Sequence, residues 1–233
     1  MASFKDHINA LTNLGISNSG TTPLDTELSE FLRDGVKDVV NKVIEARPDE
    51  LPKFCKVTNS TGSTDASVTI TGEVLSVARE HDSTSILRSC SKISPNLRYL
   101  ATDTDSIYFR SKYNPAYYEL DGLIYSVPQA SSTSNNDLVV TQVHYDIAIA
   151  HGDTYNNTGS SIDNFPTEYE YLVAIYAAIK SLEAKMAEFA IDEEDQELVT
   201  AISSNLASLK QEYAGAFAMM APPQPQQAAG GRR

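Results

Sequence analysis

Apolar residues recur three and four positions apart in two stretches near the C-terminus, and this spacing is the clearest structural signal in the chain. In the first stretch they are Leu172, Ile175, Ile179, Leu182, Met186 and Phe189. In the second stretch they are Leu198, Ile202, Leu206, Leu209, Tyr213 and Phe217. Residues at this spacing share one face of a helix, and such a face packs against an apolar partner. The pattern predicts an antiparallel helical hairpin over residues 164–217, with the two stripes packed together.

Polar residues at the ends of the predicted hairpin helices are of the kinds that helix termini favour. Thr167 and Glu170 fit a capping box at the start of the first helix. Asp192 is the expected N-cap of the second helix, and the acidic residues that follow it suit the positive end of the helix dipole.

A further helical pattern lies near the N-terminus, where residues 23–55 are predicted to supply the first helix of a bundle. Its apolar face consists of Leu28, Leu32, Val36, Val39 and Val43. Pro48 ends this helix, because the residue before a proline avoids the helical conformation. Gly35 inside the helix costs about 1 kcal/mol relative to Ala. Either this glycine permits the close approach of another backbone, or it lies at the surface and has no structural role.

The first 22 residues show some helical spacing from His7 to Leu14 but no comparable stripe. Gly15 and Gly20 stand among Ser, Asn and Thr, which is typical of flexible segments. Residues 1–22 are therefore predicted to form a flexible polar arm.

Between the helical patterns, residues 56–163 read as strands. Ala116–Val127 predicts a hairpin around the two-residue turn Asp121-Gly122, because both turn positions need positive φ. Apolar residues change parity between Val74 and Leu75, so a bulge is expected near Gly72. A short strand is expected at residues 107–109 and a long strand at residues 138–149. The predicted fold is α+β: a helical bundle with a large β-rich insertion and an extended C-terminal tail.

The tail, residues 218–233, is rich in Pro, Gln, Gly and Ala and is not expected to pack on itself. Either it is a solvated end or it folds onto a partner. Methionines adapt to irregular apolar pockets and prolines lower the entropy lost on ordering. The candidate docking residues are Met219, Met220, Pro222, Pro223, Pro225, Arg232 and Arg233.

Composition narrows the classes of function. The 233 residues carry a net charge of −13, which disfavours attraction to phosphate backbones while allowing passive contact with DNA. The two cysteines, Cys55 and Cys90, are expected to be free thiols in a reducing compartment. Apolar runs are too short to cross a bilayer, so no membrane contact is expected.

Motifs for catalysis are not found: the chain has no phosphate-binding glycine loop, nucleophile elbow or His-Glu-x-x-His sequence. The best polar constellation consists of His144, Asp146, His151 and Asp153. Their ligand number and spacing fit no defined metal site, and ordinary polar residues at the protein surface would give the same pattern. We therefore predict no catalytic residue, metal or cofactor. Asp103 and Asp105 are interpreted as a turn rather than part of a calcium loop.

Tyrosines are frequent in the β-rich region. They could line a glycan-binding surface, form cross-strand pairs or contribute to a protein interface. The residues concerned are Tyr113, Tyr117, Tyr118, Tyr125 and Tyr145.

Three segments resemble structural proteins of tailed-phage virions: residues 28–52, 110–128 (RSKYNPAYYELDGLIYSVP) and 164–180 (NFPTEYEYLVAIYAAIK). The layout is similar to that of head-to-tail connector proteins, also called adaptor or neck proteins. This resemblance implies a closed homo-oligomeric ring, commonly a dodecamer, between the portal protein and the tail or a second neck protein. It also implies assembly in the host cytoplasm, a final place in the virion neck, passive contact with genomic DNA, and a C-terminal segment inserted between portal subunits.

Three alternatives remain open at this point. The chain could be a tail-completion or second neck-ring protein, because the β-rich region is larger than in minimal adaptors. It could be a glycan-binding fibre protein, although the helical hairpin argues against this. It could be a hydrolase that uses the cluster from His144 to Asp153, although the chain offers neither a nucleophile nor a defined set of metal ligands.

Overall fold

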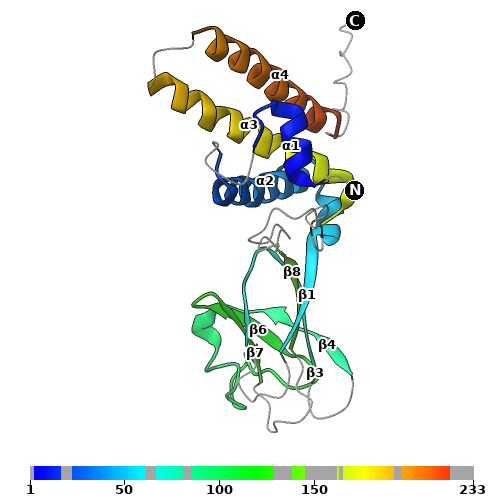
Figure 1. Cartoon of the computed structure of the whole chain (residues 1–233). Coiled ribbons are helices and arrows are strands. Elements are labelled where there is room, and N and C mark those ends of the chain that lie inside the picture. Colours follow the sequence, from blue (N-terminus) through cyan, green and yellow to red (C-terminus); the bar gives the residue numbers. More distant parts are fainter. Residues whose placement is uncertain are drawn as a thin grey trace, which may run out of the picture. The chain divides into compact units, whose positions relative to one another are not determined.

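The computed structural model describes residues 3–16, 23–60, 67–80, 86–128, 138–144, 162, 165–191 and 196–220. The fold is mixed α+β, and the chain separates into two compact units. Residues 1–53 and 147–233 form one unit, which we call the helical unit. Residues 54–146 form the other, the β unit. Figure 1 colours both along the sequence.

The helical unit contains the helices α1 (Phe4–Thr12), α2 (Asp25–Ala46), α3 (Thr167–Ile191) and α4 (Gln196–Met220), and most of the short 3-10 helix η1 (Pro48–Phe54). Helix α3 packs against α1, α2 and α4. It is accordingly apolar on several faces, since Val173, Ala174, Ala177 and Ala178 are buried as well as the predicted stripe. The interior of this unit is therefore built around α3.

The predicted stripes lie mostly inside the helical unit. Leu172, Ile175, Ile179 and Leu182 on α3 are buried, as are Ile202, Leu206, Leu209 and Tyr213 on α4. Leu198 differs from the prediction, because its side chain is 40% exposed. It lies in the first turn of α4, beside a groove of about 360 Å³ that Leu14 and Phe189 also line.

Helix α2 buries the predicted face from Leu28 to Val43. Gly35 lies where α2 meets α3: a Cβ atom there would stand 3.1 Å from Cδ1 of Tyr176 and 3.3 Å from the carbonyl oxygen of Val173. Of the two interpretations of this glycine, the structure supports close approach.

The prediction of a flexible arm over residues 1–22 is wrong for its described part, 3–16. Ser3 and Asp6 form a capping box for α1. The buried side chains of Phe4 and Ile8 give the helix an apolar face, and α1 packs on α3. The carboxamide of Asn9 both accepts from and donates to the backbone of Ile16, at 2.7 and 3.3 Å. Short amphipathic helices of this kind obtain their stability from packing rather than from sequence propensity.

The start of α3 also differs from the prediction. Thr167 is the first helical residue, and the Glu170 carboxylate accepts the backbone N–H of Ile162 at 2.8 Å. Glu170 therefore serves the preceding segment instead of a capping box with Thr167. The predicted N-cap Asp192 lies outside the described residues.

The β unit contains two four-stranded sheets. One has the order β1 (Cys55–Ser60), β8 (Leu138–Val143), β3 (Val74–Glu80) and β4 (Leu87–Ser89). The other has the order β2 (Ser67–Thr69), β7 (Leu123–Val127), β6 (Ala116–Leu120) and β5 (Ser91–Lys92). Val77, Leu138 and Val140 from the first sheet form one core with Val68 and Ile124 from the second.

The predicted hairpin is confirmed. Strands β6 and β7 pair antiparallel from Ala116–Val127 to Leu120–Leu123. The turn residues Asp121 and Gly122 have φ values of 53° and 72°, as a primed two-residue turn requires.

The bulge predicted near Gly72 is confirmed at Leu75, where the parity changes, but residues 68–77 do not form one continuous strand. The chain passes from β2 in one sheet to β3 in the other, and the bulge at Leu75 lies within β3, between the pairs made by Val74 and Ser76. Gln142, which is buried, holds this crossover: its amide nitrogen donates to the Thr69 carbonyl at 2.8 Å, and its oxygen accepts from Thr71 N–H at 3.1 Å. The parity change thus marks the bulge within β3, and the change of sheet precedes it.

Candidate functional site

The C-terminal end of α4 carries the described part of the predicted docking segment. Met219 is 84% exposed, and the carbonyl oxygen of Met220 accepts the Nε–H of Arg47 at 3.0 Å. The arginine thus binds one of the carbonyl groups that a helix leaves without an intrahelical partner. Pro222, Pro223, Pro225, Arg232 and Arg233 lie outside the described residues.

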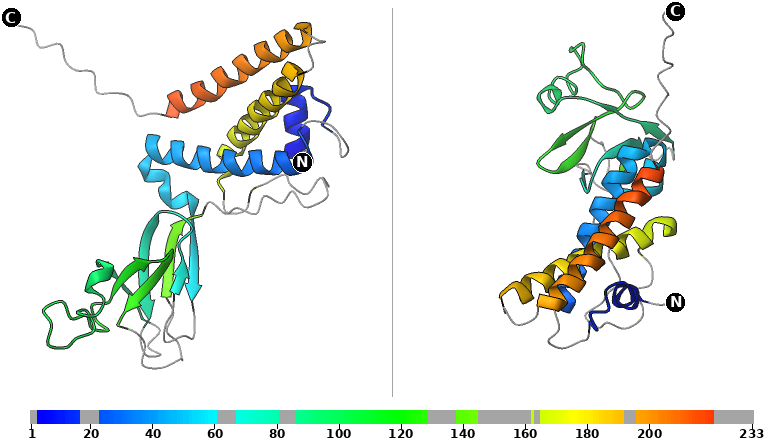
Figure 2. Two further views of the ribbon diagram at one scale, coloured as in Figure 1. Left: turned by 90° about the vertical axis from the view of Figure 1, so that its left-hand side faces the viewer. Right: turned by 90° about the horizontal axis from the view of Figure 1, so that it is seen from above.

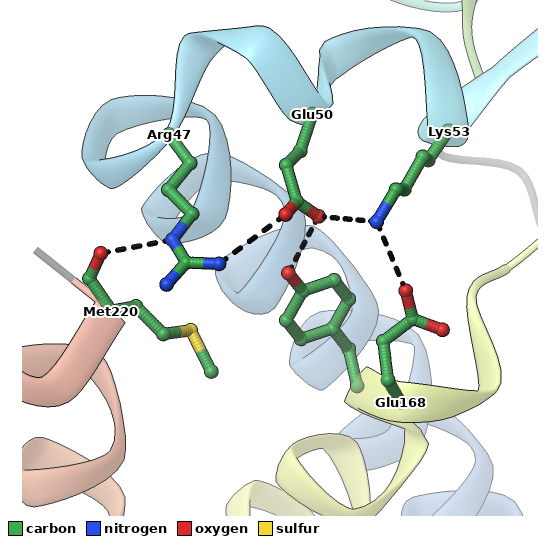
Figure 3. A network of polar contacts seen from close by, with 6 residues as sticks. Arg47, Glu50, Lys53, Glu168 and Met220 are labelled. Carbon is green, nitrogen blue, oxygen red and sulfur yellow. Dashed lines mark hydrogen bonds and ion pairs between the residues drawn. The ribbon is translucent and has the colours of Figure 1, made fainter.

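Arg47 belongs to a polar network centred on Glu50 (Figure 3). One oxygen of Glu50 accepts the Tyr169 hydroxyl at 2.6 Å and the Lys53 ammonium at 2.9 Å. The other oxygen lies 3.4 Å from Nη1 of Arg47. Lys53 also reaches Glu168 at 3.2 Å. The network therefore joins the end of α4, the short helix η1 and the first turn of α3.

The electrostatics of the network favour its charged form. The Tyr169 hydroxyl, followed by Lys53, lowers the pKa of Glu50 below its ordinary value. Burial, together with the Glu50 carboxylate, raises the pKa of Tyr169 to about 12. Glu50 is consequently ionised and Tyr169 neutral at neutral pH, which is the combination that a charge-assisted hydrogen bond needs.

Sequence reasoning missed this network. Arg47, Glu50 and Lys53 follow one another at intervals of three residues, a signal that was available, but such spacing usually marks a solvated face. Tyr169 lies 119 residues beyond Glu50 in the sequence. No local pattern connects residues so far apart.

A second exposed feature is the segment from residue 94 to residue 114, which connects β5 to β6 and which we call the 94–114 loop. A short strand was predicted at 107–109, and this is wrong: Ile107 and Tyr108 lie in turns. The amide N–H groups there are used locally, since Ser106 N–H donates to the Asp103 carbonyl and Phe109 N–H to the Ser106 carbonyl. Figure 2 (left) shows the loop projecting beyond the sheets of the β unit.

Large apolar side chains are exposed on this loop. Ile107 is 92% exposed, Tyr113 71% and Tyr99 70%, and Tyr108 and Phe109 are exposed as well. The buried Ala101 closes the loop at its base, where its carbonyl accepts Arg110 N–H at 2.9 Å. Exposed apolar groups on an ordered backbone are typical of contact surfaces.

The polar constellation from His144 to Asp153 is represented in the structure only by His144. Its backbone N–H donates to the Phe54 carbonyl at 3.2 Å, and its side chain borders a polar cleft with Thr58, Thr71 and Gln142. Asp146, His151 and Asp153 lie outside the described residues, so their relation to His144 stays a prediction.

The other sequence candidates have structural explanations. The Asp103 carboxylate accepts Asp105 N–H at 3.0 Å, which confirms the predicted turn. Cys55 and Cys90 are free thiols, as expected, and burial raises the pKa of Cys90 to about 12. Tyr118 and Tyr125 are directly paired across β6 and β7 with ring centroids 5.3 Å apart. Tyr145 lies outside the described residues.

Among the residues that the structure describes, no three His, Cys, Asp or Glu side chains are grouped as a metal site would require. No helix among them combines the length and apolar character of a membrane span.

Comparison with models of known protein families finds no match to the chain. Comparison with curated protein sequences finds none either.

Proposed function

We propose that the chain is a structural protein of the tailed-phage neck that forms a ring between the portal protein and the tail and lines the DNA passage. The proposed oligomer is a closed homo-oligomeric ring, a dodecamer in the family that the sequence resembles. It contacts a tail or second neck protein on its other side. In this role the protein catalyses no reaction.

The arrangement of the chain supports the proposal. The β unit, residues 54–146, lies in the sequence between helices that together make one helical unit. We interpret this as a helical bundle with a β insertion, which is the layout of connector proteins, here with an insertion larger than in minimal adaptors. The helices that pack around α3 form a rigid body. A ring needs rigid subunits, because it closes only when the same contact between neighbours repeats by a fixed rotation.

The observation that carries the proposal is the anchored C-terminal end of α4. Arg47 holds the last carbonyl of the helix at 3.0 Å, and Met219 beside it is exposed to solvent. A docking segment that begins at a fixed helix end leaves the protein in a defined direction. Less ordering entropy is then lost when the segment binds.

Truncation tests the portal contact. Ending the chain after Ala221 removes Pro222 to Arg233 but keeps the Met220 carbonyl for Arg47. The truncated protein should unfold at the same temperature as the full chain and should fail to bind purified portal rings, as measured by sedimentation. Unchanged affinity for portal rings would show that this segment does not bind the portal.

Imaging tests the ring. Full chain mixed with portal rings should add a second ring that negative-stain electron microscopy can resolve. The particle mass should increase by a whole-number multiple of the mass of one chain. That multiple shows whether the added ring is a dodecamer or has another number of subunits. A stable trimer with and without portal would contradict the neck assignment and favour a fibre protein. A ring that binds tail tubes but not portals would indicate a tail-completion or second neck-ring protein.

A further inference from the structure

The 94–114 loop is locally basic in an acidic protein. The loop has three cationic side chains, Arg98, Arg110 and Lys112, and two acidic ones, Asp103 and Asp105. Arg88, on the neighbouring strand β4, adds a fourth cation. Asp103 is engaged in its own turn through Asp105 N–H. Because the whole chain has a net charge of −13, the surface outside this region is more negative than the total suggests.

Cations and aromatic rings of this region are paired in two places. The Arg98 guanidinium lies 4.4 Å from the ring centre of Tyr99 and donates to its hydroxyl at 3.0 Å. Arg88 lies 5.3 Å from the ring centre of Tyr113. Within the described residues, no carboxylate lies within 4.0 Å of the Arg98 or Arg110 guanidinium. Their charges are therefore available to a partner.

Arginine and tyrosine are the residues on which protein interfaces most often depend, and they act best when held rigidly. In the loop they are held in this way, because turn hydrogen bonds and the closing contact between Arg110 and Ala101 fix the backbone. The complementary surface must offer carboxylates around an apolar recess that can receive Ile107.

We infer that the 94–114 loop docks onto a carboxylate-bearing surface of a second copy of this chain. The chain itself supplies the complementary charge, since most of its acidic residues lie in the helical unit. Two such loops repel each other, so the contact joins the loop to a different surface of the next copy. Contacts of this head-to-tail kind generate rings when they close, and in this respect the inference rests on the proposed ring.

Self-association of the full chain tests the inference. Sedimentation velocity over micromolar to near-millimolar concentrations should show mass increasing with concentration at low salt and less so at high salt, because salt screens exposed charges. The double variant Arg98→Glu, Arg110→Glu should need at least about tenfold more protein to associate, because each 1.4 kcal/mol of lost contact is a factor of ten. Ile107→Ser tests the apolar part of the same contact.

A control variant reverses one cation elsewhere in the β unit, which is half the change in charge of the double variant. Lys56→Glu reverses an exposed cation of the same β unit, on β1 of the other sheet, and should associate like the parent chain. Unfolding temperatures of all variants establish that they fold, and the 92% exposure of Ile107 makes Ile107→Ser a variant that leaves the core untouched.

Chemical coupling identifies the contacted surface. A carbodiimide joins an amine to a carboxylate that touches it, and mixing unlabelled with ¹⁵N-labelled protein marks the links formed between copies. Mixed links should join Lys112 to Asp or Glu residues of the helical unit.

Three outcomes would overturn the inference. The full chain could stay monomeric throughout the concentration range, the loop variants could associate as the parent does, or the links could join two loops. The first two leave the neck assignment standing if portal rings still bind the chain. Failure to bind portal rings, with loop-dependent association intact, would contradict the neck assignment alone.

Discussion

The Glu50 carboxylate accepts hydrogen bonds from three side chains. The Tyr169 hydroxyl, at 2.6 Å, is the largest cause of its lowered pKa. Tyr169 is buried, so Tyr169→Phe removes a donor without creating a cavity. At neutral pH the variant should lose about 1.5–3 kcal/mol of unfolding free energy, the range for a hydrogen bond to a charged group. Urea titration gives this difference, and Tyr171→Phe, on the exposed side of α3, is the matched control.

The same contact predicts a dependence on pH. Since folding lowers the pKa of Glu50 below its ordinary 4.5, its stabilisation is complete above that value and is lost as pH falls through the folded pKa. The gap between parent and Tyr169→Phe should therefore narrow at acidic pH. A gap that stays constant down to the acid transition would mean that packing, not the carboxylate, accounts for the loss.

The sequence predicts the role of a residue best when that role depends only on its neighbours in the chain. Asp121-Gly122 was predictable because positive φ at two adjacent positions selects these residue types. The Glu50 network was not, because Tyr169 reaches it only after α2 and α3 have packed. Leu198 has the correct helical spacing, yet its side chain is 40% exposed, because spacing does not reveal how far along a helix its partner extends.

Gly35 and Gly215 form a natural pair for testing the contact between α2 and α3. Both lie inside helices, where Ala is favoured over Gly by about 1 kcal/mol. A Cβ at Gly215 meets nothing within 4 Å, so Gly215→Ala should stabilise by about that amount. At Gly35 the Cβ meets the Val173 carbonyl at 3.3 Å, a backbone atom that cannot easily move.

Gly35→Ala should therefore show no gain or a net loss of unfolding free energy, and Gly35→Val a clear loss. Thermal unfolding of the three variants decides the matter. Equal stabilisation by Ala at both positions would mean that the two helices can separate slightly at no cost.

The hairpin core gives a second comparison. Ile179 and Leu206 are buried on α3 and α4, so Ile179→Ala or Leu206→Ala should cost about 2–5 kcal/mol. Leu198→Ala removes an equally large side chain from a site that is 40% exposed and should cost less, approaching the 0.5 kcal/mol or so of surface changes. Denaturant titration measures all three, and a cost for Leu198 equal to that of Leu206 would contradict its assignment to the surface.

Helices and strands were predictable to different degrees. The periodicity of α2, α3 and α4 extends over many turns, so their existence follows from the sequence alone. Helix α1 is only nine residues long, and its stability depends on α3 and on the contact between Asn205 and the Leu11 carbonyl. The path from β2 to β3 was misread because alternation within a strand does not reveal which sheet the strand joins.

Across the whole molecule, charge is distributed unevenly, and this bears on the proposed DNA passage. The net charge of −13 repels phosphates, whereas the 94–114 loop offers a few cations and aromatic rings. Within the screening length of about 10 Å at 0.1 M salt, the many negative charges outweigh these few cations. Stacking and cation–π contacts act only between groups that touch. A channel that DNA must traverse should therefore have little affinity for it.

We expect the full chain to show no binding to duplex DNA in fluorescence anisotropy, even at low salt, where electrostatic attraction would be strongest. The Arg98→Glu, Arg110→Glu variant should be indistinguishable from the parent in this assay, because neither binds. Measurable binding by the parent that weakens with salt and disappears in the variant would identify the loop as a nucleic-acid site. That result would contradict both the passive conduit and the docking of the loop onto a second copy.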